Sequence, residues 1–285
     1  MADELLAIAV PVARDAAATA RRMRAEAITD VETKSTDTDV VTAADKAVER
    51  QVVEALRTAR PGDRVLGEEY GDSGARAPGT GPATGAWSSG QRGESDKAPA
   101  VRWLLDPIDG TVNYLYGLPQ YAVSLAAESD GAVVAGVVIN AATGEEWTAT
   151  RGGGAWHGGR RLSGSDRTEL EQTLLGTGFG YDPARRAHQG AVLARLIMRV
   201  RDIRRFGSAA LDLCAVAEGT LDAFFEKGLN PWDHAAGGLV AAEAGVVVSG
   251  LRGAPAGADM VLAAPPAIFA PLHDALVELD AAGGP

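Results

Sequence analysis

The chain has little cysteine and little positive charge, and each shortage narrows the functions open to it. A single cysteine, Cys214, occurs in 285 residues, so an intrachain disulfide and a cysteine-rich metal site are excluded and a cytoplasmic location is expected. Lys and Arg number 27 against 38 Asp and Glu, which gives a formal net charge of −11. Because nucleic acids and anionic membranes require a basic face on their partner, we expect direct binding to neither.

Long hydrophobic runs are also missing. No apolar stretch approaches the roughly 20 residues that a membrane-spanning helix needs. The segment LLAIAVPVA at 5–13 could form the core of a signal peptide, but Asp3 and Glu4 stand where such a signal carries positive charge. The apolar pattern continues through ARDAAATARRMRAEA, so we predict one amphipathic helix over 3–27.

The first 160 residues combine helices with antiparallel strands. A second helix is predicted over 42–62, where Thr42 fits the N-cap position and Asp45 follows three residues later. Three further segments are predicted as strands: RVLG at 64–67, the buried VRWLLD at 101–106, and an antiparallel meander over 121–159. Residues 71–100 are dominated by Gly, Ala, Pro and Ser without an apolar period, which predicts an exposed, flexible insertion.

Past about residue 165, strands alternate with helices, as in α/β proteins. Two of the predicted helices begin at a capping residue, Ser208 in SAALDLCAVAEG and Asp233 in DHAAGGLVAAEAG. We therefore predict an α+β part over 1–160 and an α/β part over 161–285, packed together as one compact unit.

Acidic residues gather where strands end or helices begin. The clusters are Glu68-Glu69 in GEEYG, Asp106 and Asp109 in DPIDGT, and Asp233 in NPWDHAAG. Carboxylates massed at one site repel each other unless cations bind there or some groups stay protonated, and hard oxygen ligands suit Mg²⁺.

Each cluster also has an ordinary explanation. Glu68-Glu69 alone fits a solvated pair, Asp233 and Asp45 fit helix caps, and DPIDG fits a simple turn. The spacing by itself leaves a metal site and these structural roles open.

Together, however, the clusters resemble the inositol monophosphatase family of Mg²⁺-dependent, lithium-sensitive phosphatases. The matching segments occur in family order over nearly the whole chain: KSTDTDVVTAAD (34–45), GEE (67–69), WLLDPIDGTVNY (103–114), GSAALDLCAVAEG (207–219) and WDHAAG…EAG (232–245). The insertion at 71–100 is the main departure. The resemblance implies a layered αβαβα sandwich of the sugar-phosphatase type, assembled as a homodimer.

The resemblance also implies a set of two to three Mg²⁺ ions and their ligands. Glu68, Asp106 and the Ile108 carbonyl would hold the first ion. Asp106 would bridge to a second ion, held with Asp109 and Asp233, and Glu68 would help to bind a third.

Further roles follow from the same resemblance. Thr111 with Asp45 would take the proton from the attacking water, and the helix beginning at Gly110 and Thr111 would hold the phosphate through its backbone N–H groups. The remaining family positions would line the polyol pocket or lie in loops near the metals: Gly207, Ser208, Ala209 and Glu226 for the pocket, Lys34 and Glu69 for the loops.

The expected reaction is hydrolysis of a phosphate monoester by metal-activated water, since paired metal ions clamp the attacking and leaving oxygens. The leading substrate is myo-inositol 1-phosphate or a related small phosphate. Alternatives within the superfamily are histidinol phosphate, fructose 1,6-bisphosphate and 3′-phosphoadenosine 5′-phosphate. A non-catalytic partner of the transcription machinery is a further alternative, against which the complete ligand set argues.

Overall fold

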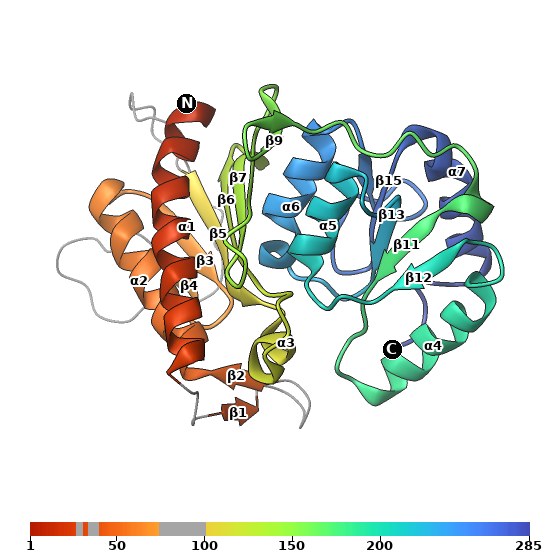
Figure 1. Ribbon diagram of the computed structural model, residues 1–285, viewed down its shortest axis with the longest axis horizontal. Coiled ribbons are helices and arrows are strands. Elements are labelled where there is room, and N and C mark those ends of the chain that lie inside the picture. Colours follow the sequence, from red (N-terminus) through yellow and green to blue (C-terminus); the bar gives the residue numbers. More distant parts are fainter. Residues whose placement is uncertain (27–30, 34–39, 74–100) are drawn as a thin grey trace, which may run out of the picture.

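The computed structural model describes residues 1–26, 31–33, 40–73 and 101–285. Lys34 and residues 74–100 of the predicted insertion lie outside these ranges. The described elements form five layers, helix, sheet, helix, sheet, helix, from the left to the right of Figure 1. The predicted αβαβα sandwich is therefore confirmed.

The first layer and the sheet beneath it come from the N-terminal part of the chain. Helices α1 (Ala2–Ala25) and α2 (Ala43–Ala59) cover one face of an eight-stranded sheet with the order β10-β9-β8-β7-β6-β5-β3-β4. Its pairs are antiparallel except β3 with β5, which run parallel. The strands are β3 (Arg64–Gly67), β4 (Gly71–Ser73), β5 (Val101–Asp109), β6 (Ala122–Ser129), β7 (Ala132–Asn140), β8 (Glu146–Thr150), β9 (Gly154–His157) and β10 (Arg160–Arg161).

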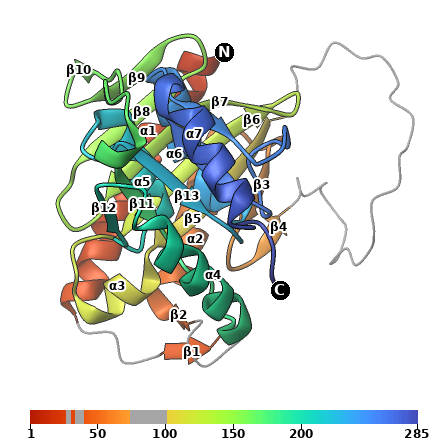
Figure 2. The ribbon, with the colours of Figure 1, turned by 90° about the vertical axis from the view of Figure 1, so that its right-hand side faces the viewer.

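The other layers come from the C-terminal part. Helices α5 (Ala209–Glu218) and α6 (Pro231–Glu243) lie between the two sheets, while α4 (Pro183–Leu196) and α7 (Pro266–Glu278) cover the outer face of the second sheet (Figures 1 and 2). That sheet has the order β12-β11-β13-β15-β14. Its strands are β11 (Leu174–Thr177), β12 (Asp202–Arg204), β13 (Ala223–Glu226), β14 (Val247–Ser249) and β15 (Val261–Ala264).

Three smaller elements complete the described part of the chain. A two-stranded antiparallel sheet pairs β1 (Val31–Thr33) with β2 (Val40–Thr42). A short helix, α3 (Thr111–Tyr116), follows β5 directly, and a 3₁₀ turn, η1 (Leu170–Gln172), precedes β11. None of the described helices has the length and apolar character needed to cross a membrane.

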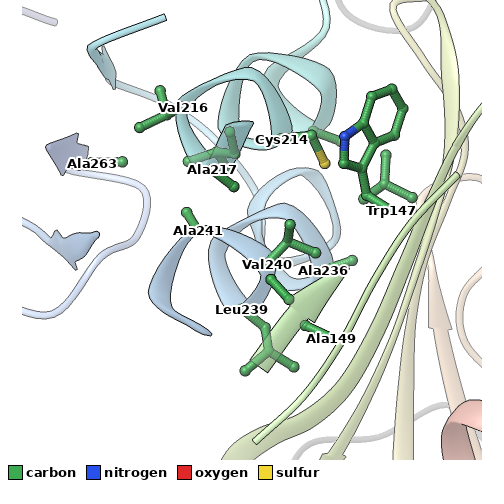
Figure 3. Packing of buried hydrophobic residues seen from close by; sticks show 14 of the residues in the cluster. Trp147, Ala149, Cys214, Val216, Ala217, Ala236, Leu239, Val240, Ala241 and Ala263 are labelled. Carbon is green, nitrogen blue, oxygen red and sulfur yellow. The ribbon is translucent and has the colours of Figure 1, made fainter. Parts of the chain in front are cut away.

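The apolar side chains pack in clusters that follow the layers. One cluster fills the space between α1, α2 and the first sheet, another joins the first sheet to α5 and α6, and a third lies beneath α4 and α7. Figure 3 shows the middle cluster, where Trp147 of β8 lies against Cys214 of α5, and Ala236 and Val240 of α6 face the sheet. Because both parts of the chain bury this cluster together, it fixes the second sheet relative to the first.

Two predicted boundaries are wrong. Residues 71–73 of the predicted flexible insertion form β4. Their backbone hydrogen bonds to β3 order them, although their composition predicted no ordered structure. Helix α6 begins at Pro231 with Asn230 as its N-cap, so Asp233 is the third helical residue and not the cap. Proline suits the first helical position, because it has no N–H group to leave unpaired.

Candidate active site

A cavity of about 500 Å³ opens between the two parts of the chain. Residues from the ends of β3, β5 and β13 and from the beginnings of α3, α5 and α6 line it together. Most of the predicted site residues are among them: Glu68, Asp106, Ile108, Asp109, Gly110, Thr111, Gly207, Ala209, Glu226 and Asp233. Positions more than 150 residues apart in the sequence thus converge on one cavity.

The DPID segment ends β5 with an irregularity in the strand pairing. Asp106 pairs with Ser124 and Asp109 pairs with Ala122. Between these two pairs β5 contains one residue more than β6, as in a β-bulge. Asp106 Oδ1 accepts a hydrogen bond from Ile108 N at 3.0 Å, and Thr111 Oγ1 donates to the Ile108 carbonyl at 3.1 Å. The bulge lets both aspartates line the cavity, which strict alternation of a strand would not do for positions three apart.

Gly110 makes the transition from β5 into α3. Its φ of +92° lies in the left-handed region, and a Cβ there would come within 2.7 Å of the Gln120 carbonyl oxygen. Only glycine meets both conditions without strain. This residue therefore starts α3 at the cavity wall, where backbone N–H groups at a helix N-terminus can bind an anion.

Asp45, near the beginning of α2, is fully buried and is not among the residues that line the cavity, and its two oxygens have different environments. Its Oδ2 accepts hydrogen bonds from the backbone N–H of Thr42, at 3.0 Å, and from the Thr42 hydroxyl, so the predicted capping box is confirmed. Its Oδ1 is buried and has no hydrogen-bond partner among the described residues. Burial raises the pKa of Asp45 to about 7, the bonds from Thr42 oppose this rise, and the charges of Glu68 and Glu69 add to it.

Asp109 connects the two parts of the chain. Its Oδ2 accepts hydrogen bonds from Ser208 Oγ at 2.6 Å and from Ala210 N at 2.7 Å, at the beginning of α5. Burial raises the pKa of Asp109 to about 6, although these bonds favour the charged form. The hydroxyl of Ser208 is therefore turned toward Asp109, and its side chain does not line the cavity as the polyol-pocket prediction required.

Glu226 and Asp233 complete the acidic wall from the C-terminal part. Burial raises the pKa of Glu226 to about 8, and the charge of Asp109 adds to this rise while Arg205 opposes it. Asp233 Oδ2 accepts a hydrogen bond from Asn230 N at 2.7 Å. Burial, followed by the charge of Asp109, raises the pKa of Asp233 well above its usual range.

Asp106 lies in the most negative surroundings of this wall. Burial raises its pKa well above the usual range, and the charges of four other carboxylates add to this rise, namely Glu68, Asp109, Asp233 and Asp45. Hard oxygen donors in a negative field, with a buried Oδ1 of Asp45 left unpaired, fit a hard divalent cation such as Mg²⁺.

The carboxylates surround the cavity without meeting at one point. Within the described residues, no three Asp, Glu, His or Cys side chains stand close enough together to hold one ion as they are. Magnesium is commonly bound through one or two carboxylates, with water and substrate phosphate as the other ligands. An ion can therefore bind to one or two of these carboxylates as they stand, and a third would join only when its side chain moves toward the bound ion. On these terms the residues fit the cation.

Glu69 has a different place from Glu68. Its backbone N–H donates to the Glu49 carboxylate of α2, and it is not among the residues that line the cavity. Lys34 lies outside the described residues, so its predicted place in a loop near the metals stays a prediction.

Sequence reasoning missed the positive residues of the cavity. Arg185 of α4, Arg205 before α5 and Lys227 after β13 line it on the C-terminal side. Lys227 Nζ donates to the main-chain oxygens of Gly283 and Gly284 at 2.7 and 3.1 Å, which anchors the last residues of the chain beside the cavity. Isolated cations on separate elements form no motif, so the sequence carried no signal for them.

Glu49 and Asp212 were missed for another reason. Both are charged residues within helices that the sequence predicted as packed, and they are only 1% and 2% exposed. Glu49 lies four positions after Asp45, on the same face of α2, which is a signal that could have been used. Burial raises the pKa of Asp212 well above its usual range, and the charge of Glu226 adds to it.

Comparison with known proteins gives consistent results. The model of the inositol monophosphatase family matches residues 1–279. The inositol-1-monophosphatase of Mycobacterium leprae (strain TN) is 45% identical over 289 aligned positions, covering 96% of this chain and 94% of that protein. The solved structure of Mycobacterium tuberculosis SuhB superimposes with a TM-score of 0.78 at 38% identity, covering 99% of this chain and 98% of that one. The Nus factor SuhB of Salmonella typhimurium (strain LT2) is 39% identical, covering 75% of this chain and 73% of that protein.

Proposed function

Because the chain belongs to the inositol monophosphatase family, we propose that it is a Mg²⁺-dependent phosphatase that hydrolyses myo-inositol 1-phosphate and related small phosphate monoesters. The products are inositol and inorganic phosphate. The observation that carries the proposal is the cavity in which Glu68, Asp106 and Asp109 from one part of the chain meet Asp233 and Glu226 from the other.

Two to three Mg²⁺ ions are the proposed cofactor. Glu68, Asp106 and the Ile108 carbonyl would hold one, and Asp106, Asp109 and Asp233 would hold another. When bound, Mg²⁺ would supply an activated water and stabilise the charge that develops on the phosphate. Support comes from the raised pKa of Asp106, whose neighbouring charges are all negative.

The chain's own residues would orient the phosphate and move a proton. Thr111 and the backbone N–H groups behind Gly110 face the cavity where the phosphate would bind. Asp45, with its pKa near 7 and an unpaired Oδ1, would accept the proton of the attacking water, in a pair with Thr111. A group whose pKa lies near the working pH is suited to that task.

Glu226 is proposed to select the polyol. It lines the cavity opposite the β5 carboxylates, together with Gly207 and Ala209 at the beginning of α5. A carboxylate offers several acceptor sites, which suits a ring that carries several hydroxyl groups. Histidinol phosphate, whose ammonium group could pair with Glu226, remains the main alternative substrate.

The first test is Asp106→Asn, which removes one charge from both proposed metal positions. Metal-ion catalysis lowers barriers by several kcal/mol, so we expect turnover to fall by about a thousandfold or more. Phosphate release from myo-inositol 1-phosphate at several Mg²⁺ concentrations measures this. Asp130→Asn, at an exposed turn, is the matched control, and near-normal turnover in folded Asp106→Asn would contradict the proposal.

Other family properties are proposed on the same basis. We expect a cytoplasmic homodimer whose activity lithium inhibits, and light scattering together with LiCl titration against NaCl would test these properties. The Salmonella relative named a Nus factor makes a protein partner in transcription the second candidate function. Co-purification of RNA polymerase with a variant that lacks phosphatase activity would favour that candidate.

A further inference from the structure

Glu68 lies in a tight hairpin turn. Strands β3 and β4 pair as far as Gly67 with Gly71, so residues 68–70 form a three-residue loop. Gly71 has a φ of +67°, the left-handed conformation that typically follows the turn in such loops. On the strands alone, this small loop at the sheet edge would be free to shift, because β4 has just three residues.

Glu49 of α2 holds this loop from outside the sheet. Its Oε2 accepts a hydrogen bond from Glu69 N at 2.8 Å, and its Oε1 accepts one from Tyr70 N at 3.0 Å. The side chain is 1% exposed, so water does not compete for these bonds. One carboxylate thus binds two successive backbone N–H groups of the loop, directly after Glu68.

Gly67 allows the carboxylate to come this close. A Cβ built on Gly67 would overlap both oxygens of the Glu49 carboxyl. Gly67 does not have a positive φ, so its backbone conformation alone would allow a side chain at this position. The close approach of Glu49 is therefore what makes glycine necessary here.

The same helix also carries Asp45, whose charge acts on Asp106 of the cavity. Residues four apart on a helix lie on one face, so Asp45 and Glu49 are neighbours on the same face of α2, one turn apart. The helix thereby sets where the Glu68 loop stands relative to Asp45.

We propose that Glu49 is a positioning residue that sets the Mg²⁺ affinity of the site by holding the 68–70 loop in place. The inference rests on the proposed function, in which Glu68 is a metal ligand. Glu49 does not line the cavity, so it would not be a ligand of the bound ion itself. Its effect passes through the backbone to Glu68.

The test is Glu49→Gln, which keeps the shape of the side chain but turns an amide N–H₂ toward one of the two N–H groups. Residues that hold metal ligands in place typically contribute 10–100-fold to metal affinity. We expect Mg²⁺ binding, measured by calorimetry on the substrate-free protein, to weaken by at least about tenfold. Turnover at saturating Mg²⁺ should return to within a few-fold of wild type, with little change in KM for the substrate.

Two further variants separate geometry from charge. Glu49→Asp keeps the charge but is one methylene shorter, so it should weaken Mg²⁺ binding as Glu49→Gln does. Gly67→Ala should have the same effect while Glu49 itself is intact, because the new Cβ displaces the carboxylate. The matched control is Glu54→Gln, which removes the same charge from an exposed position of α2 and should leave Mg²⁺ binding unchanged.

The outcomes distinguish this inference from the proposed function. A wild-type protein that binds no Mg²⁺ would overturn both. Wild-type binding with equal Mg²⁺ affinity in Glu49→Gln, even at a lower melting temperature, would leave the function standing and reduce Glu49 to a structural residue. If Glu49→Gln does not fold, Gly67→Ala and Glu49→Asp decide the question, and unchanged Mg²⁺ affinity in both would refute the positioning role.

Discussion

The two carboxylate oxygens of Asp45 have different roles, helix capping for one and the proposed acceptance of a proton for the other. The two roles can therefore be measured separately. Oδ2 serves the capping box with Thr42, and Oδ1 has no hydrogen-bond partner. In Asp45→Asn the amide oxygen can still accept from Thr42, and loss of a cap costs about 1 kcal/mol at most sites. Loss of a proton acceptor should instead lower kcat by roughly a hundredfold or more.

We therefore expect Asp45→Asn to lose its rate and keep most of its stability. Thermal denaturation and kcat at saturating Mg²⁺ measure the two quantities on one preparation. A lower melting temperature with unchanged kcat per folded molecule would assign Asp45 to capping alone.

Glu226 is the residue at which the substrate can be tested. Mg²⁺ bound beside Asp109 would lower the pKa of Glu226, so we expect an ionised carboxylate in the working enzyme. Glu226→Gln should then lower kcat/KM for myo-inositol 1-phosphate. The loss should correspond to about 1–3 kcal/mol of binding free energy, the value of hydrogen bonds to a charged group. Hydrolysis of an aryl phosphate, which lacks the ring hydroxyls, should be almost unchanged.

The two substrates serve as controls for each other. An equal loss on both would mean that Glu226 supports the metal positions. A wild-type preference for histidinol phosphate would overturn the inositol assignment.

The sequence could predict the residues of the acidic wall but not all of their surroundings. Asp106 and Asp109 stand in one short segment whose pattern is distinctive, so their common place at the cavity was predictable. Arg205 and Lys227 come from separate elements, and only the packing of α5 and β13 brings them to the cavity. Asp233 lines the cavity but is not the predicted cap, because Asn230 and Pro231 begin the same helix.

At the scale of elements, the junction between β5 and α3 depends on one glycine. Gly110→Ala would impose a positive φ on alanine and bring its Cβ within 2.7 Å of the Gln120 carbonyl oxygen. Backbone strain of this kind costs about 1–3 kcal/mol. We expect a lower melting temperature and a clearly weaker affinity for inorganic phosphate, since the beginning of α3 must move.

Gly131→Ala is the matched control for this variant. Gly131 has a φ of +77°, but a Cβ there would meet no atom within 4 Å, and it lies in the turn between β6 and β7. It should lose stability through φ alone and keep its phosphate affinity. Equal phosphate affinity in both variants would show that α3 does not hold the phosphate.

Elements with a clear period were predictable, and elements defined by pairing were not. Helices α1 and α2 follow their apolar stripes, and β6 and β7 follow apolar runs bounded by turns that contain glycine. Strand β4 has no such signal in GDS, since it is ordered by hydrogen bonds to β3. Helix α3 spans six residues, too few for a period to appear.

At the scale of the whole molecule, the buried acids make stability depend on pH. The pKa of Asp45 rises from 3.8 to about 7 and that of Glu226 from 4.5 to about 8, both through burial. Without metal, the folded protein thus holds protons that the unfolded chain has released. The free energy of unfolding therefore falls by up to about 1.4 kcal/mol per pH unit for each group as pH rises from about 4 toward 7 to 8, and it levels off above that range.

Melting temperatures between pH 6.5 and 8.5 in a chelator test this prediction. His234, whose pKa burial lowers from 6.5, opposes this fall at the lower end of the window, because part of this histidine is still protonated in the unfolded chain there. Added Mg²⁺ should raise the melting temperature most at the upper end, where the carboxylates are ionised. A melting temperature that rises with pH in the chelator would contradict the assignment.

In the structure, the segment between Arg161 and Leu170 passes from the first sheet to the second, and Glu68, Asp106 and Asp109 precede it while Glu226 and Asp233 follow. A chain cut in that segment would yield two fragments, each with an incomplete acidic wall and each exposing part of the cluster around Trp147 and Cys214. Neither fragment alone could hydrolyse a phosphate ester. Phosphate release from a mixture of the two fragments would therefore measure how many pairs had reassembled. If each fragment were fused to another protein, the same activity would measure whether those two proteins bind each other.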